Sequence, residues 1–199
     1  MTSLAETWYT PEEYLALERK AEYKSEYING QIYSMSGASR EHSLIAVNVV
    51  SEIRSQFRGR ACEVYNSDMR VKVSPGGTYT YPDAVAVCDE PHFEDAAVDT
   101  LTNPTVIVEV LPPSTEAFDR GEKFRQYRRL ESLAEYVLIA QDKVQVEHYA
   151  RHGDKGDQWV LTEFSDLGGT LQLASIGCEL AVADIYDKVP VQSPSSEQI

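Results

Sequence analysis

Two carboxylates lie in segments whose neighbours are almost all apolar. Asp83 lies in YPDAVAVC and Glu109 lies in VIVEVL. An ionised acid in an apolar strand costs several kcal/mol unless a partner compensates its charge, so a structural salt bridge is one interpretation of each acid. The two segments follow each other along the chain, however, and carboxylate oxygens from two adjacent strands suit a hard divalent cation. We therefore predict a shared Mg²⁺ or Mn²⁺ site at Asp83 and Glu109.

A strongly basic segment follows Glu109. Ten residues carry five basic side chains and one acid, and the basic ones are Arg120, Lys123, Arg125, Arg128 and Arg129. By itself this pattern is typical of a solvated amphipathic helix face. Beside two metal-binding acids, however, cations are what a phosphate-handling site requires, which makes the four arginines candidate nucleic-acid contacts. Lys123 and Tyr127 are four residues apart, so they share one helix face and can both point at the sheet.

Composition limits the functions that this chain of 199 residues can have. Apolar residues make up 42% and charged residues 25%, which is ordinary for a globular protein. Acids outnumber bases 32 to 18, and the net charge of −14 disfavours sequence-independent binding to DNA or to an anionic membrane. A local basic strip and an acidic metal site both remain compatible with this charge.

Cysteine usage and hydropathy predict the compartment. Cys62, Cys88 and Cys178 form no CxxC pair, so we expect three unpaired, buried side chains in a reducing compartment. No apolar run approaches the roughly 18 residues that a membrane-spanning helix needs. The first ten residues lack both a basic start and an apolar stretch, which argues against a signal peptide. These observations together predict a cytoplasmic protein.

Local signals predict the first elements of the chain. Thr10, Pro11 and Glu13 combine a capping residue, a first-turn proline and a capping-box glutamate, so a short helix should begin there. Asn29-Gly30 predicts a β-hairpin. A longer helix should follow Ser39, with one apolar face and a stop glycine, and the residues concerned are Ala46, Val50, Ile53, Phe57 and Gly59.

The remaining pattern predicts an α/β fold around one sheet. Strands are expected over 62–73, 79–88 and 105–111, then a helix over 118–130, then strands over 136–141 and 144–149. We expect two more strands and a short helical turn in the C-terminal third, and a solvated acidic loop over 88–102. Residues 1–189 should form one domain, followed by a flexible tail over 190–199.

Three segments in this order point to a family. YPDAVAV, NPTVIVEVLPPSTEAFDRGEKFRQYRRL and EYVLIAQDKVQVEHYAR resemble the Uma-two family of restriction-endonuclease-like proteins, over about Ser25 to Arg151. That family is assigned to the PD-(D/E)XK nuclease superfamily, whose core is helix, three strands, helix, strand. The resemblance therefore implies a restriction-endonuclease-like core with a mixed central sheet and extra C-terminal strands.

The resemblance also implies roles for individual residues. Asp83 supplies the first metal ligand and Glu109 the second, and the backbone carbonyl of Val110 is a candidate third. The superfamily lysine is expected two residues after the glutamate, where this chain has Leu111. Related nucleases supply this lysine from the following helix, and Lys123 is the corresponding candidate. Family members commonly have serine where this chain has Pro112, a further departure.

Four more residues match family positions or lie near the expected site. Glu26, in SEYINGQI, is either a further metal ligand or a surface hairpin acid. His42, at the start of the long helix, is either a packing or capping residue or a member of the site. Gln141, at the end of the last core strand, and Tyr127 are candidates for supporting the ligands.

The predicted function is a metal-dependent nuclease that hydrolyses phosphodiester bonds, acting on DNA through a local basic strip. Asp83 and Glu109 would hold Mg²⁺ or Mn²⁺, and Lys123 would orient the attacking water and offset the charge that develops on the phosphate. The alternative is a non-cleaving nucleic-acid-binding or regulatory module that retains the fold. A structural dimerisation protein is the third interpretation, and a homodimer remains open.

Overall fold

The computed structural model describes residues 7–74, 77–113, 116–153 and 158–191. Its helical elements are α1 (Pro11–Glu18), α2 (Arg40–Gln56), α3 (Glu116–Phe118), the π-helical turn η1 (Asp119–Lys123), α4 (Phe124–Tyr127) and α5 (Val182–Ile185). Its strands are β1 (Ser25–Ile28), β2 (Gln31–Ser34), β3 (Glu63–Asn66), β4 (Arg70–Ser74), β5 (Thr78–Thr80), β6 (Ala84–Val87), β7 (Thr100–Leu101), β8 (Val106–Leu111), β9 (Glu135–Ala140), β10 (Val146–His152), β11 (Gln158–Phe164), β12 (Thr170–Leu173) and β13 (Cys178–Ala181).

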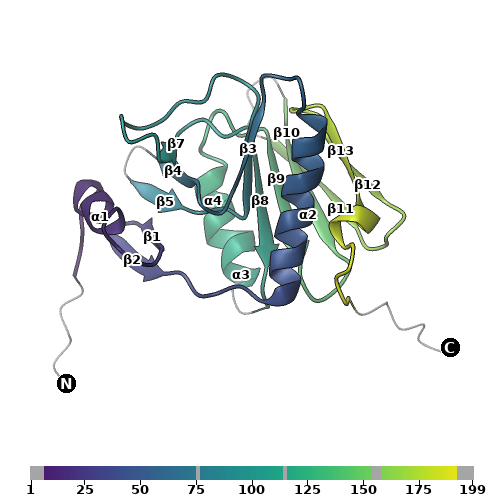
Figure 1. The fold of residues 1–199 in the computed structure, drawn as a ribbon, viewed down its shortest axis with the longest axis horizontal. Coiled ribbons are helices and arrows are strands. Elements are labelled where there is room, and N and C mark those ends of the chain that lie inside the picture. Colours follow the sequence, from purple (N-terminus) through teal and green to yellow (C-terminus); the bar gives the residue numbers. More distant parts are fainter. Residues whose placement is uncertain (1–6, 75–76, 114–115, 154–157, 192–199) are drawn as a thin grey trace.

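A six-stranded mixed sheet forms the centre of the molecule (Figure 1). Its order is β11-β10-β9-β8-β6-β3; β8 and β9 are parallel and the other neighbours are antiparallel. All six residues of β8 are buried, as expected for a strand covered on both faces. The sheet therefore needs a packed layer on each side.

One face of this sheet packs on α2, α5 and the β12-β13 hairpin. Ile45, Val49 and Ile53 of α2 contact the inward side chains of the sheet, among them Val108 and Val137. Since successive strand residues alternate between faces, the neighbours Ile107 and Leu138 belong to the opposite cluster. This alternation divides the core into two layers.

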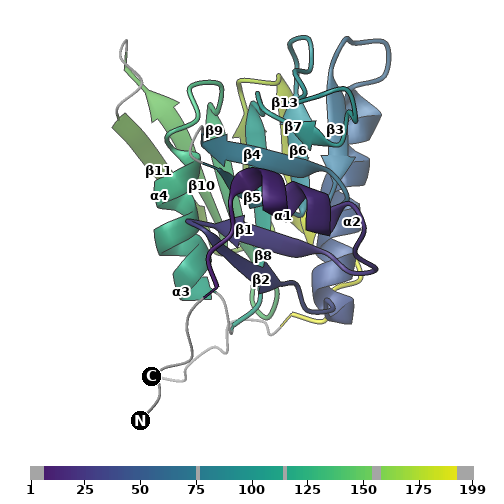
Figure 2. The same ribbon diagram turned by 90° about the vertical axis from the view of Figure 1, so that its left-hand side faces the viewer.

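A second sheet covers the opposite face together with α4. Its order is β2-β1-β5-β4-β7, and its strands run across those of the six-stranded sheet (Figure 2). Val71 and Val73 of β4 pack into the same apolar cluster as Tyr127 of α4. Helix α1 lies on the outer side of this sheet, where Tyr14 stacks on Tyr27.

The predicted first helix and hairpin are confirmed. Thr10 and Glu13 form a reciprocal capping box at the start of α1. The turn between β1 and β2 needs positive φ at Asn29 (49°) and Gly30 (91°), conformations that these residue types favour. Ser39 caps α2 as predicted. The apolar face of this helix differs from the prediction, because its most buried side chains are Ile45, Val49, Ile53 and Phe57, whereas Ala46 and Val50 lie at the border of the face.

Two predicted strands are each broken in two. The segment 62–73 turns at Asn66, whose side chain accepts from the Asp68 amide, so that β3 joins the six-stranded sheet and β4 the second sheet. The segment 79–88 changes sheets at Pro82 and Asp83, because proline cannot donate a ladder hydrogen bond. Apolar runs alone do not reveal such a crossing between sheets.

Three further expectations are corrected in detail. The helix expected over 118–130 spans 116–127 and contains the π-helical turn η1, and Leu130 is buried in the turn after it. The C-terminal third contains three strands rather than two, because β13 precedes α5. The acidic segment is anchored rather than merely solvated, since β7 pairs with β4 and Asp99 binds Arg19 and Arg70 at 2.8 and 2.9 Å.

The expectation of three unpaired cysteines is wrong. Cys62 and Cys88 form a disulfide, and only Cys178 is a free, buried thiol. The two half-cystines extend the antiparallel register in which Glu63 of β3 faces Val87 of β6. Because β4 and β5 intervene in the sequence, the cysteine spacing gave no sign of this pairing. The prediction of a reducing compartment, which rested on unpaired cysteines, loses that support.

None of the helices in the described ranges is long and apolar enough to cross a membrane. Of the tail expected over 190–199, residues 192–199 lie outside the described residues. The single-domain boundary stays a prediction.

We expect the free energy of unfolding of the Cys62→Ser/Cys88→Ser double variant to be about 3 kcal/mol lower than that of the oxidised protein. The reason is that the disulfide closes a loop with a sequence separation of 26, which restricts the unfolded chain. Urea melts measure this difference. Reductant should lower the stability of the natural chain to that of the variant and leave the variant unchanged. Equal stability of both proteins without reductant would contradict the expectation.

Candidate active site

A buried ammonium group lies among three carboxylates. Nζ of Lys123 lies 3.1 Å from Oε1 of Glu26 and 3.1 Å from Oε1 of Glu109. Asp119 Oδ1 lies 3.4 Å from the same nitrogen. The side chains of all four residues are at most 11% exposed, so this charge cluster is shielded from water. It joins β1, β8 and η1 at one point.

Glu109 is held on its strand by a second donor. The Tyr127 hydroxyl donates to Oε1 of Glu109 at 2.7 Å and lies 2.9 Å from Oγ1 of Thr80. Burial raises the pKa of Glu109 to about 8; Lys123 opposes this rise, while Asp119, Asp83 and Glu26 add to it. The pKa of Tyr127 is also raised, first by burial and then by Glu109, so its hydroxyl keeps the proton that it donates.

The charge on Lys123 follows from the same arrangement. Burial alone would lower the pKa of Lys123, but Glu109, Glu26 and Asp119 together raise it well above its ordinary value. Lys123 is therefore a fixed positive charge in the described structure. The side chains of Lys123 and Tyr127 both contact Glu109 of β8, which agrees with the prediction that both point at the sheet.

Asp83 lies at the crossing between the sheets, directly before β6. Its Oδ2 accepts the backbone N–H of Val110 at 2.7 Å, so β8 itself orients the carboxylate. Its Oδ1 lies 2.7 Å from Nε2 of His42 in the first turn of α2. The strands β6 and β8 are neighbours, as the sequence predicted. The His42 side chain thus contacts a predicted metal ligand, and its backbone N–H donates to the capping hydroxyl of Ser39.

Gln141 lies beside this group rather than inside it. It directly follows β9, its backbone N–H donates to the Leu111 carbonyl, and its Oε1 accepts from the Ser39 hydroxyl at 3.2 Å. Ser39 caps the helix that carries His42, so Gln141 braces the end of α2 that faces Asp83. Glu26 is not the surface acid of the alternative interpretation, because it is 8% exposed and contacts Lys123.

The four predicted nucleic-acid arginines do not converge on the carboxylates. Arg120 forms ion pairs with Glu116 and Glu147, and Arg125 pairs with Glu122 at 2.7 Å. Arg128 and Arg129 are exposed beyond the end of α4. Arg125, Arg128 and Arg129 are exposed on the helical segment, whereas Arg120 is half-buried against Glu147 of β10.

Sequence reasoning missed Asp119. It is 5% exposed and lies in the same π-helical turn as Lys123, four residues before it. The spacing was a usable signal, since residues four apart share a helix face and Lys123 was already expected to face the sheet.

Comparisons with known proteins bear on this geometry. The sequence model of the family described as "Uma2: Putative restriction endonuclease" matches residues 11–183. The chain belongs to this family. Two uncharacterized proteins of Synechocystis sp. are similar: slr1290 is 38% identical over 89% of this chain and 90% of its own length, and sll1609 is 40% identical over 77% and 86%.

A solved structure shares the Uma2 fold of this chain. It is a crystal structure described as "a putative nuclease belonging to DUF820" from Anabaena variabilis, with a TM-score of 0.73, 20% identity, and coverage of 91% of this chain and 99% of that one. The predicted restriction-endonuclease-like α/β fold is therefore confirmed. Membership in a family described as a restriction endonuclease supports a nuclease.

The donor set of this Uma2 protein fits a divalent cation. In the structure as described, no three His, Cys, Asp or Glu side chains are arranged so that they could bind one metal ion. The Lys123 ammonium group occupies the space between Glu26 and Glu109. Three acids surround that one ammonium group, however, and burial together with the neighbouring acids, Asp83 included, raises the pKa of Glu109. Carboxylate oxygens are the ligands that Mg²⁺ and Mn²⁺ prefer.

We expect the stability of the protein to fall as pH rises from about 5 to about 8 in chelator. Folded Glu109 keeps its proton up to about pH 8, whereas an ordinary glutamate releases it near 4.5, so the folded state binds more protons over this interval. Urea melts across the range should show a shallower fall for Glu109→Gln. Parallel curves for the two proteins would contradict the raised pKa.

Proposed function

We propose that this chain is a Mg²⁺- or Mn²⁺-dependent endonuclease that hydrolyses phosphodiester bonds of DNA. The observation that supports it most is the buried cluster of Glu26, Glu109 and Asp119 around Lys123, next to Asp83, in a member of a restriction-endonuclease family. A surplus of buried carboxylates is costly for stability alone and is typical of sites that bind a cation.

Asp83 and Glu109, with Glu26, would hold the cation. When bound, it would polarise the scissile phosphate and favour ionisation of the attacking water. Val110 N–H and His42 keep the Asp83 carboxylate in one orientation, and Tyr127 does the same for Glu109. Such supporting hydrogen bonds raise the precision of a site whose ligands come from different elements.

Lys123 would act on the reacting phosphate. With the negative charge of Glu26 and Glu109 compensated by a cation, its ammonium group becomes available to orient the attacking water and to offset charge on the phosphoryl oxygens. The superfamily lysine is expected on β8, at the position that buried Leu111 occupies here. Lys123 would supply the same ammonium group from η1 instead.

Nucleic acid would contact the outer surface of the helical segment. Arg128 and Arg129 are exposed there, whereas a phosphate at Arg120 or Arg125 would have to displace a carboxylate of this chain. With a net charge of −14, binding should be weak and strongly salt-dependent.

The second candidate is a nucleic-acid-binding or regulatory module without cleavage. Leu111 favours it, because an apolar residue stands at the position of the usual catalytic lysine. The two candidates differ in one observable, the metal-dependent cleavage of a phosphodiester bond.

We expect Mg²⁺ and Mn²⁺ to bind one principal site and to raise the melting temperature, because a ligand of the folded state stabilises it. Titration calorimetry and thermal melts measure both effects. Glu109→Ala should abolish saturable binding, and Glu131→Ala, which changes an exposed acid, should not. Unchanged binding in Glu109→Ala would defeat the proposed ligand set.

We expect metal-dependent nicking of supercoiled plasmid, which Asp83→Ala abolishes. Lys123→Met should lower the nicking rate by about 100-fold or more while Mg²⁺ binding survives, in line with the loss of a group that stabilises transition-state charge. The matched control is Lys143→Met, since Lys143 is exposed. Metal binding without nicking in the natural chain would favour the non-cleaving module.

A further inference from the structure

The Cys62–Cys88 disulfide lies at the end of the molecule opposite to the carboxylate cluster along β6. Asp83 directly precedes this strand and Cys88 directly follows it. Both half-cystines are partly exposed and line a pocket of about 760 Å³, together with Arg58, Arg60 and Tyr65. Both half-cystines therefore border a space large enough for a small thiol.

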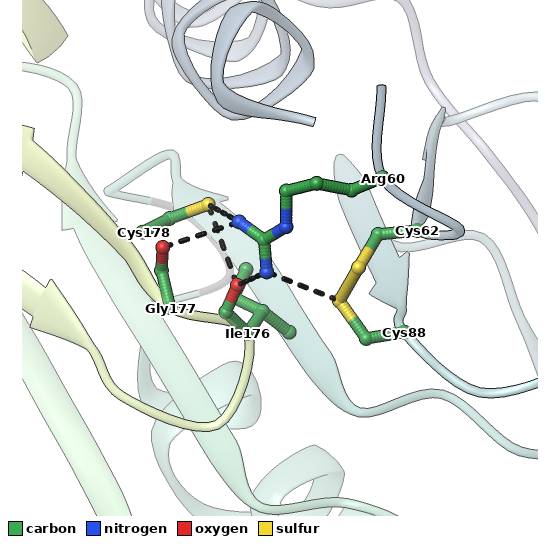
Figure 3. Close-up of a disulfide and its surroundings, with 6 residues drawn as sticks. All are labelled: Arg60, Cys62, Cys88, Ile176, Gly177 and Cys178. Atoms are coloured by element: carbon green, nitrogen blue, oxygen red, sulfur yellow. Dashed lines mark hydrogen bonds between the residues drawn. A yellow bond between two sulfur atoms is a disulfide. The ribbon is translucent and has the colours of Figure 1, made fainter. Parts of the chain in front are cut away.

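A guanidinium group is held beside one of the two sulfurs (Figure 3). Nη2 of Arg60 lies 4.0 Å from Sγ of Cys88, and the side chain extends toward Cys178 on its other side. Backbone carbonyls fix its position, since Nη1 donates to the Gly177 oxygen at 3.2 Å and Nη2 donates to the Ile176 oxygen. The guanidinium also lies over the Phe57 ring, 5.2 Å from its centroid.

This placement makes the two sulfurs chemically unequal. In thiol–disulfide exchange, the sulfur that leaves does so as a thiolate, and a better stabilised thiolate leaves faster. A neighbouring arginine stabilises a thiolate. The cation at Cys88 therefore favours Cys88 as the leaving group and Cys62 as the atom that is attacked.

The third cysteine does not compete for the bond. Cys178 is 4% exposed, and its thiol lies 3.8 Å from Nη1 of Arg60. Burial raises the pKa of the Cys178 thiol although Arg60 opposes the rise, so the sulfur stays protonated and is a poor nucleophile. The attacking thiolate must come from outside the protein.

We propose that the Cys62–Cys88 disulfide is a thiol–disulfide exchange site that reacts with a small dithiol in the adjoining pocket, with Arg60 directing attack to Cys62. A thiolate of the dithiol bonds to Sγ of Cys62, the Cys62–Cys88 bond breaks, and its electron pair leaves on Sγ of Cys88. The second thiolate of the dithiol then bonds to the first sulfur and displaces Cys62. Water protonates both protein thiolates; the protein gains two electrons, and the dithiol is oxidised to its disulfide.

Reduction removes a covalent link at the edge of the six-stranded sheet. Within the described ranges, β3 is the edge strand of the six-stranded sheet and pairs only with β6, so the disulfide secures four residues that have no second neighbour strand there. The proposal does not depend on nuclease activity, because it concerns sulfur atoms and a pocket outside the carboxylate cluster.

Reduction rates with dithiothreitol test the role of Arg60. Oxidised protein is mixed with excess dithiothreitol, and free thiols are followed over time by maleimide labelling. Arg60→Gln should slow reduction by about 3- to 10-fold, since the charge that stabilises the leaving thiolate is gone. Arg60→Lys keeps the charge and should stay within about twofold of the natural chain, as should Arg58→Gln, which removes an exposed charge from the same pocket.

A monothiol tests which of the two sulfurs is attacked. If Arg60 had only a structural role, replacing it would not change this choice. Reduced glutathione should be trapped on Cys62 in the natural chain, as peptide mass spectrometry reports. Arg60→Gln should spread the label over Cys62 and Cys88. Labelling mainly at Cys88, equal labelling in the natural chain, or equal rates for Arg60→Gln and Arg58→Gln would overturn the proposal. Three free thiols in protein kept without reductant would overturn it at the outset.

Discussion

The buried ammonium group of Lys123 connects both sheets and the helical segment at one point. Its ion pair with Glu26 links it to the second sheet, and its ion pair with Glu109 links it to the six-stranded sheet. Asp119, its third partner, lies in the same helical segment as Lys123. Removing one partner from a buried ion cluster typically costs 3–5 kcal/mol, because the remaining charges are left uncompensated in a low dielectric. The relative placement of both sheets and the helix therefore depends in part on this charge, which is also the charge that we propose acts on the phosphate.

A second constraint is the passage of the chain between the sheets at Pro82 and Asp83. β5 ends in one sheet and β6 begins in the other, so the residue between them borders both. Both oxygens of Asp83 are committed to other elements, one to the backbone of Val110 in β8 and one to His42 in α2. Binding a cation at Asp83 and Glu109 would therefore act on the junction of both layers, which explains why we expect metal to change global stability and not only activity.

Local chemistry was readable from the sequence, and most long-range pairing was not. The capping box at Thr10, the Asn29-Gly30 turn and the shared helix face of Lys123 and Tyr127 all follow from spacings of a few residues. The adjacency of β6, which follows Asp83, and β8, which carries Glu109, was a long-range pairing that the order of the strands along the chain predicted. The splitting of two apolar runs between sheets and the Cys62–Cys88 bond depend on which distant strands pair, and no periodicity encodes that choice. Asp119 falls between these cases, because its contact is local but the π-helical turn that holds it was not foreseen.

The spread of the charge cluster along the chain has a consequence for biosynthesis. Its members run from Glu26 to Lys123, and Gln141 braces the same end of the sheet, so about a hundred residues after Glu26 must leave the ribosome before they can meet. Strand β8 also needs β9 as its parallel partner, a pairing across an intervening helical segment that forms slowly compared with a hairpin. An emerging chain therefore holds its acids apart in an open, hydrated state. The proposed nuclease would therefore acquire its cutting site only after β9 has emerged and paired with β8.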